Sequence, residues 1–121
     1  MSEIRVKHIL QKHLGSRNPN DSYRKKPITR TKEEAISNIN QFREQIKSME
    51  DWDRIAAEYS ECGSAANAGD LGFFGPGAMQ KAFEEAAFAT PVGQISGLVD
   101  TDSGIHIILR LVWFSPFENS N

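Results

Sequence analysis

The sequence predicts an α+β domain in which helices pack against a mostly antiparallel sheet. Three observations predict this class: an alternating segment near the start, helical apolar stripes in the middle, and two apolar runs joined by a turn near the end. The predicted order is β, α, α, β, α, β, β, without an internal repeat. A chain of 121 residues fits one domain. We therefore expect one domain over residues 1–121, with its core at about 4–111, a basic loop at 14–30 and a tail at 112–121.

The first half of the chain predicts one strand and two helices. A half-buried strand is indicated because Ile4, Val6, His8 and Leu10 alternate with Arg5, Lys7 and Gln11. Residues 14–30 follow as a long loop. Thr31 begins a helix, and Glu34 completes its capping box. The apolar stripe of that helix is Ala35, Ile39, Phe42, Ile46 and Met49. Asp51 is predicted to cap a second helix, whose apolar face is Trp52, Ile55, Ala56 and Tyr59.

The second half predicts a helix between strands. Residues 60–69 are small and polar, which favours a turn region, and residues 71–74 suit one edge strand. A third helix from Met79 or Gln80 to Ala89 is ended by Thr90-Pro91 and Gly93. A strand at 95–100 and a hairpin turn at 101–104 follow. Residues 105–112 carry apolar side chains on both faces, which places this strand in the sheet centre.

Composition is typical of a soluble globular protein, with 39% hydrophobic and 25% charged residues. No apolar run is long enough to span a membrane, and the N-terminus lacks a signal core. Cys62 is the only cysteine, so a reducing compartment is predicted, and both cytoplasm and nucleus are reachable. No Cys/His cluster has zinc spacing, and we expect neither a metal nor a cofactor. A monomer is expected.

Positive charge is concentrated in one segment of a chain whose net charge is −2. Only Asp21 opposes the basic residues there, which are Lys12, Arg17, Arg24, Lys25, Lys26, Arg30 and Lys32. Such an island on an acidic body indicates a locally focused anionic ligand, and a solvated loop without a ligand is the alternative. Duplex nucleic acid is not expected, because the basic patch is one short segment.

Residues 63–83, GSAANAGDLGFFGPGAMQKAF, carry the main binding-site signal. Their glycines permit sharp turns, which can gather Leu71, Met79 and Phe83 into one concave wall. If the fold brings His8 and His106 beside Cys62, the result is a small apolar cup with a polar floor. Such a cup suits a compact apolar ligand such as a proline ring.

Five segments resemble the parvulin family of peptidyl-prolyl cis/trans isomerases, in particular its phospho-directed, Pin-type branch. They are RVKHILQKH at 5–13, ITRTKEEA at 28–35, SECGSA at 60–65, GDLGFFGPGAMQKAFEEAAFA at 69–89 and TDSGIHIILR at 101–110. The resemblance implies a four-stranded antiparallel sheet surrounded by about three to four helices, with the active site on the concave face of the sheet. It implies a catalytic domain without the N-terminal WW domain that some relatives carry.

The resemblance also implies the roles of individual residues. The catalytic group is Cys62, His8, His106, Ser103 and Thr101. The proline pocket is Leu71, Met79, Phe83 and Gln80. The phosphate-binding group is Lys12, Arg17 and Asn18. The implied partners are proline-containing protein segments with phosphoserine or phosphothreonine before the proline. Where the branch has two adjacent arginines, this chain has Arg17-Asn18, and Arg24, Lys25 or Lys26 are candidates to supply the missing charge.

Other interpretations of these residues stay open. A single histidine on an apolar strand face is more often structural than catalytic, and His13 is expected on the polar face without a role. A non-catalytic phosphopeptide-binding or chaperone module on the same fold is the alternative to an isomerase. A Cys-His hydrolase would need an oxyanion hole and a base oriented on the thiol. The aromatic tail, with Trp113, Phe114 and Phe117, is expected to pack back onto the domain.

Overall fold

The computed structural model describes residues 3–111, so the expectations for Val112 and for the aromatic tail lie outside the described residues. The strands are β1 (Ile4–Gln11), β2 (Asn20–Asp21), β3 (Lys26–Pro27), β4 (Asp70–Phe74), β5 (Val99–Thr101) and β6 (Gly104–Arg110). The helices are α1 (Lys32–Gln45), α2 (Met49–Tyr59), the short 3-10 helix η1 (Gly63–Asn67) and α3 (Lys81–Ala89). Within residues 3–111, no helix is long and apolar enough to cross a lipid bilayer.

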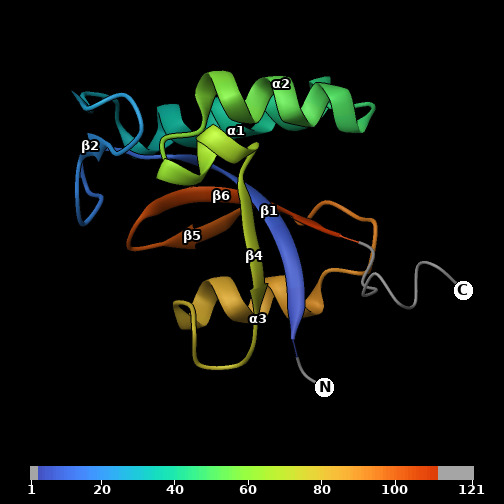
Figure 1. Ribbon diagram of the computed structural model, residues 1–121. Helices are drawn as coiled ribbons and strands as arrows, with labels where there is room; N and C mark the ends of the chain where they lie inside the picture. Colours follow the sequence, from blue (N-terminus) through green and yellow to red (C-terminus); the bar gives the residue numbers. More distant parts are fainter. Residues whose placement is uncertain (1–2, 112–121) are drawn as a thin grey trace, which may run out of the picture.

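The main sheet has four antiparallel strands in the order β4-β1-β6-β5, which confirms the predicted fold class and the central place of the last strand. Helices α1 and α2 cover one face of this sheet, and α3 covers the other (Figure 1). Because side chains alternate along a strand, β1 and β6 send neighbouring residues to opposite faces. Ile9 and Ile107 thus pack toward α1 and α2, whereas Val6 and Ile108 pack toward α3.

The first strand is more buried than its alternation predicts. Arg5 and Lys7 are partly exposed, but every residue of β1 from His8 to Gln11 is buried. Ile9 packs beneath α1 and α2, and Gln11 bonds to the Tyr59 carbonyl oxygen at 2.9 Å and to Asn38 at 2.8 Å. The half-buried interpretation was therefore wrong for the second half of the strand, which lies between two layers of helices.

The helix boundaries follow local capping chemistry. The predicted capping box of α1 is present, with Thr31 and Glu34 each accepting a hydrogen bond from the other's backbone N–H. The cap of α2 is Ser48 rather than the predicted Asp51, and Met49 begins α2 instead of ending the stripe of α1. Asp51 takes part from within the helix, because its carboxylate accepts the Lys47 N–H at 2.8 Å while its own N–H donates to Ser48.

Two other segments differ from the sequence-based expectation. The basic loop contains a small hairpin, in which β2 and β3 pair antiparallel with Asn20 opposite Pro27 and Asp21 opposite Lys26. The predicted strand at 95–100 is reduced to a bridge from Ile95 to Leu109 and the short β5. Between them the Ser96 hydroxyl, rather than a backbone carbonyl, accepts the Ile108 N–H at 2.9 Å, which interrupts the regular ladder.

Candidate active site

Two central strands place a histidine pair on the α3 face of the sheet. His106 is directly opposite Leu10 and His8 is opposite Ile108, so the two histidines are diagonal neighbours. Their Nδ1 atoms are 3.0 Å apart, and their rings stack with centroids at 5.1 Å. A contact of this length needs one proton between the two nitrogens, so one ring donates and the other accepts.

Hydroxyl groups extend this pair at both ends. The Ser64 Oγ atom, from η1, lies 3.2 Å from His8 Nε2. The Thr101 Oγ1 atom, from β5, lies 2.7 Å from His106 Nε2 and accepts the Ser103 N–H at 3.1 Å. A continuous line of hydrogen bonds thus joins η1 to the β5–β6 turn through the two imidazoles. It fixes the ring orientations, because every imidazole nitrogen has a partner.

Burial keeps both imidazoles neutral. His8 and His106 are each only 4% exposed. Burial lowers the pKa of His8 from 6.5 to about 4. The pKa of His106 is also lowered well below its ordinary value, by burial and then by the proximity of His8. At neutral pH both rings are therefore uncharged, and the pair acts as a neutral hydrogen-bond network that orients its neighbours.

An apolar cavity of about 200 Å³ opens above this pair. It is lined by His8, Cys62, Leu71, Met79, Gln80, Phe83, Ser103 and His106. The Phe83 ring stands edge-on to both imidazoles, with centroid distances of 5.5 Å to His8 and 5.2 Å to His106. The structure thus brings together the predicted proline-pocket residues and all the predicted catalytic residues except Thr101, which contacts His106 from outside the cavity.

Three polar side chains, Gln80, Ser103 and Cys62, line this cavity together with its apolar residues. Gln80, at the N-cap position of α3, donates to the Ser103 hydroxyl at 3.2 Å. Cys62 occupies the N-cap position of η1, where its sulfur accepts the Ser64 N–H at 3.5 Å. The thiol is free and partly exposed. It can therefore contact a ligand directly, beside the apolar wall of the cavity.

A second, polar cavity of about 190 Å³ adjoins the first. Its lining is Leu10, Lys12, Arg17, Asn18, Ser22, Cys62 and Ser103, so Cys62 and Ser103 line both cavities. The Lys12 ammonium donates to the Asn20 carbonyl oxygen at 2.6 Å and to Ser22 Oγ at 3.0 Å. An ammonium has three donors, so one is left for a ligand. The three predicted phosphate-binding residues are therefore together, beside the thiol.

Most other cations of the basic segment are engaged in structural contacts. Arg24 bonds to Asp21 and to the carbonyl oxygens of Ser60 and Ala57. Arg30 pairs with Glu61, and Lys32 pairs with Asp100. Lys26 lines a different hollow, which contains Glu61. None of Arg24, Lys25 and Lys26 lines the polar cavity, so none of them replaces the arginine that is absent at Asn18. The charge at the polar cavity comes from Lys12 and Arg17.

Sequence reasoning missed three residues around the site. Ser64 orients His8, and its place two residues after Cys62 was the available signal. Glu61, to which the sequence assigned no role, is buried and binds Arg30. His13 is buried rather than on the polar face; its Nδ1 accepts the Gly15 N–H at 3.0 Å. Among residues 3–111, no group of three or more His, Cys, Asp or Glu side chains is placed to hold a metal ion.

The fold and the paired cavities define a small isomerase domain of the parvulin kind. A family model described as rotamase, PPIC-type PPIASE domain, matches residues 8–111. The chain belongs to this family, and it is a peptidyl-prolyl cis-trans isomerase.

Named relatives agree with this assignment. The chain is 47% identical to the buparvaquone-resistant peptidyl-prolyl cis-trans isomerase NIMA-interacting 1 of Theileria annulata, over 92% of this chain and 81% of that protein. It is 53% identical to the putative peptidyl-prolyl cis-trans isomerase dodo of Drosophila melanogaster, over 89% of this chain and 65% of that protein. The solved peptidyl-prolyl isomerase ESS1 from Candida albicans superposes with a TM-score of 0.85 at 41% identity, covering 92% of this chain and 63% of that chain.

Proposed function

We propose that the chain isomerises prolyl bonds preceded by phosphoserine or phosphothreonine, and that it does so without a covalent intermediate. One observation carries the proposal: an apolar cavity and a cationic cavity share Cys62 and Ser103 as a common wall. In such a substrate the phosphate belongs to the residue before the proline, so the reacting bond lies between the phosphate and the ring. The two shared residues are suited to flank that bond.

The chemistry requires a site that favours the twisted amide. Rotation about the peptide bond breaks its resonance, with a barrier of roughly 18–20 kcal/mol. A catalyst must therefore bind the twisted form better than either planar form. The cavity formed by Leu71, Met79 and Phe83 supplies an apolar environment for the proline ring. It also disfavours the polar planar amide relative to the less polar twisted one.

Polar groups at the rim are suited to stabilise the amide as its resonance is lost. The Ser103 hydroxyl and the Cys62 thiol both border the cavity, and Ser103 is held by Gln80. The neutral histidine pair lies beneath them and orients Thr101, whose hydroxyl accepts the Ser103 N–H. Under this proposal His8, His106 and Thr101 are positioning groups, and no proton transfer to the substrate is needed.

The phosphate would be held by charge-assisted hydrogen bonds from Lys12 and Arg17, with Asn18 as a neutral donor. Lys12 is held in place, because it is 5% exposed and two of its three donors are already occupied. Arg17 is exposed and forms no ion pair among residues 3–111. These features favour an anion that approaches from solvent.

The test is an exchange measurement on paired peptides that differ only in phosphorylation of the serine before proline. We expect a much higher kcat/KM for the phosphorylated peptide, and a Lys12→Met variant that loses this preference while still isomerising the unphosphorylated one. Lys26→Met, outside both cavities, serves as the charge-matched control and should retain the preference. Equal rates on the two peptides with the unaltered protein would refute phosphate direction and leave the isomerase assignment intact.

A further inference from the structure

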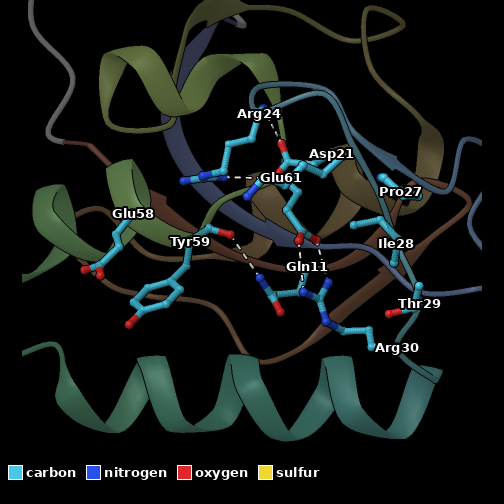
Figure 2. Close-up of a pocket in the computed structure, with 11 residues that line it drawn as sticks. Gln11, Asp21, Arg24, Pro27, Ile28, Thr29, Arg30, Glu58, Tyr59 and Glu61 are labelled. Atoms are coloured by element: carbon cyan, nitrogen blue, oxygen red, sulfur yellow. Dashed lines mark hydrogen bonds and ion pairs between the residues drawn. The ribbon is translucent and has the colours of Figure 1, made fainter.

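Glu61 lies directly before Cys62 in the chain but does not line either cavity of the candidate site. Its side chain extends instead into a separate polar hollow of about 270 Å³, together with Gln11, Asp21, Arg24 and Arg30 (Figure 2). The Glu61 side chain is only 7% exposed. A charge this deeply buried needs several partners, and their identity indicates what the residue does.

The carboxylate and its partner arginine hold both backbone groups of Lys12. The Lys12 N–H donates to Glu61 Oε1 at 2.8 Å, and the Lys12 carbonyl oxygen accepts from Arg30 Nη1 at 2.8 Å. Arg30 closes the arrangement with two bonds to the carboxylate, at 2.7 and 3.0 Å. Strand β1 ends one residue earlier, at Gln11, so these buried groups have no partner in the sheet. The ion pair therefore fixes the backbone that carries Lys12.

The backbone of Glu61 reaches three further parts of the polar cavity. Its N–H donates to the Leu10 carbonyl oxygen at 2.9 Å, and its carbonyl oxygen accepts the Ser22 N–H at 3.1 Å. Its C-terminal peptide bond leads to Cys62. Leu10, Lys12, Ser22 and Cys62 are thus each bonded to Glu61, and all four line the polar cavity. Glu61 thus holds four residues that line the polar cavity, although it does not line that cavity itself.

We propose that Glu61, held by Arg30, is a positioning residue that sets the placement of the Lys12 ammonium relative to the Cys62 thiol. The inference rests on the proposed phosphate role of Lys12. A bidentate arginine–carboxylate pair is suited to this task, because its planar fork fixes geometry as well as charge. Losing the paired hydrogen bonds between Arg30 and Glu61 lets the end of β1 move relative to Cys62 and η1. Displacements of this kind reduce rates strongly even when no catalytic group is removed.

The test compares Glu61→Gln and Arg30→Lys with Ile39→Val, a core substitution in α1 away from both cavities. Glu61→Gln retains an acceptor for the Lys12 N–H but removes the charge, and Arg30→Lys retains the charge but removes the fork. We expect kcat/KM for the phosphorylated peptide to fall roughly 10- to 100-fold in both variants, mainly through KM. The rate on the unphosphorylated peptide should fall less. Ile39→Val should keep the unaltered ratio between the two peptides.

A second measurement separates positioning from general stability and from the phosphate proposal. Hydrogen exchange at the Lys12 amide, measured by NMR, should accelerate in Glu61→Gln and Arg30→Lys relative to Ile39→Val. Unchanged exchange with an unchanged peptide ratio in both variants would overturn the inference. If the unaltered protein shows no preference for phosphate, the proposed specificity fails. The positioning role of Glu61 is then decided by the Lys12 amide exchange alone, with acceleration supporting it and no change overturning it.

Discussion

The buried histidine pair predicts a specific loss of stability in mild acid. Burial lowers the pKa of His8 from 6.5 to about 4, so the folded protein resists protonation there while the unfolded chain does not. Between pH 6.5 and 4 the unfolded state binds more protons, and the free energy of unfolding falls with falling pH. For His8 alone this fall is roughly 2 kcal/mol between pH 7 and pH 4.5. His106 adds to it, because its pKa is also lowered.

The measurement is urea unfolding at pH 7, 5.5 and 4.5 for the unaltered protein and for His8→Gln. In the variant the His8 contribution is absent. Its free energy of unfolding should therefore fall over the same range by about 2 kcal/mol less than that of the unaltered protein. Ile9→Val, the next residue on β1 but on the opposite face, is the control and should keep the full pH dependence. The reasoning is refuted if His8→Gln and the unaltered protein lose stability in parallel.

The lower limit of pH 4.5 keeps this effect apart from that of the carboxylates. Burial alone would raise the pKa of Asp21 and of Asp70, but hydrogen bonds with Arg24 and Arg5 outweigh it and lower each pKa below 3.8. Their stabilising contribution is therefore present above pH 3.8 and is lost only as the pH falls further. A loss of stability above pH 4.5 is thus assigned to the histidines.

Three further predictions concern the backbone and the cavity. Gly69→Ala should lower the free energy of unfolding by roughly 3 kcal/mol or more, because φ is +83° and a Cβ would lie 2.1 Å from the His8 carbonyl oxygen. Gly72→Ala, also at positive φ but in open space, should lower it by only about 1–2 kcal/mol, as measured by chemical unfolding. Met79→Ala should lower kcat/KM roughly tenfold or more on phosphorylated and unphosphorylated peptides alike, since it removes one wall of the apolar cavity; a change confined to one peptide would contradict this. Cys62→Asp should retain much of the turnover, whereas near-total loss in a folded variant would indicate covalent attack by the thiol.

Local sequence patterns predicted the main elements well where a few neighbouring residues decide the geometry. The Thr31–Glu34 capping box and the turn at 101–104 are both present, because their chemistry is contained within four residues. The start of α2 could not be assigned from the same rules. Ser48 and Asp51 are both good capping residues three positions apart, and each side chain accepts a backbone N–H at this end of the helix: Ser48 from Asp51, and Asp51 from Lys47. The pattern alone therefore does not say which of the two lies outside the helix.

The site was predicted from the resemblance to a known family rather than from composition. Periodicity places His8 and His106 on strands, but only the pairing of β1 with β6 makes them diagonal neighbours. Contacts set by long loops were not predictable in this way. Ser22 and Arg30 meet Glu61 across 39 and 31 residues of sequence, respectively, through a loop whose path no local pattern specifies. His13 becomes buried through the same loop.

The basic segment shows that a high number of basic residues does not by itself make an anion-binding site. Seven cations suggested one anion-binding surface, yet Arg24, Arg30 and Lys32 each bind a carboxylate of this chain. The two cations at the polar cavity are also unlike each other: Lys12 is buried and held by neighbours, whereas Arg17 is exposed. Exposed charges are screened by salt, and buried ones much less. Under the proposed phosphate role, Lys12 therefore contributes most of the binding to the phosphate. This is why the hydrogen bonds that Glu61 and Arg30 make with the Lys12 backbone matter.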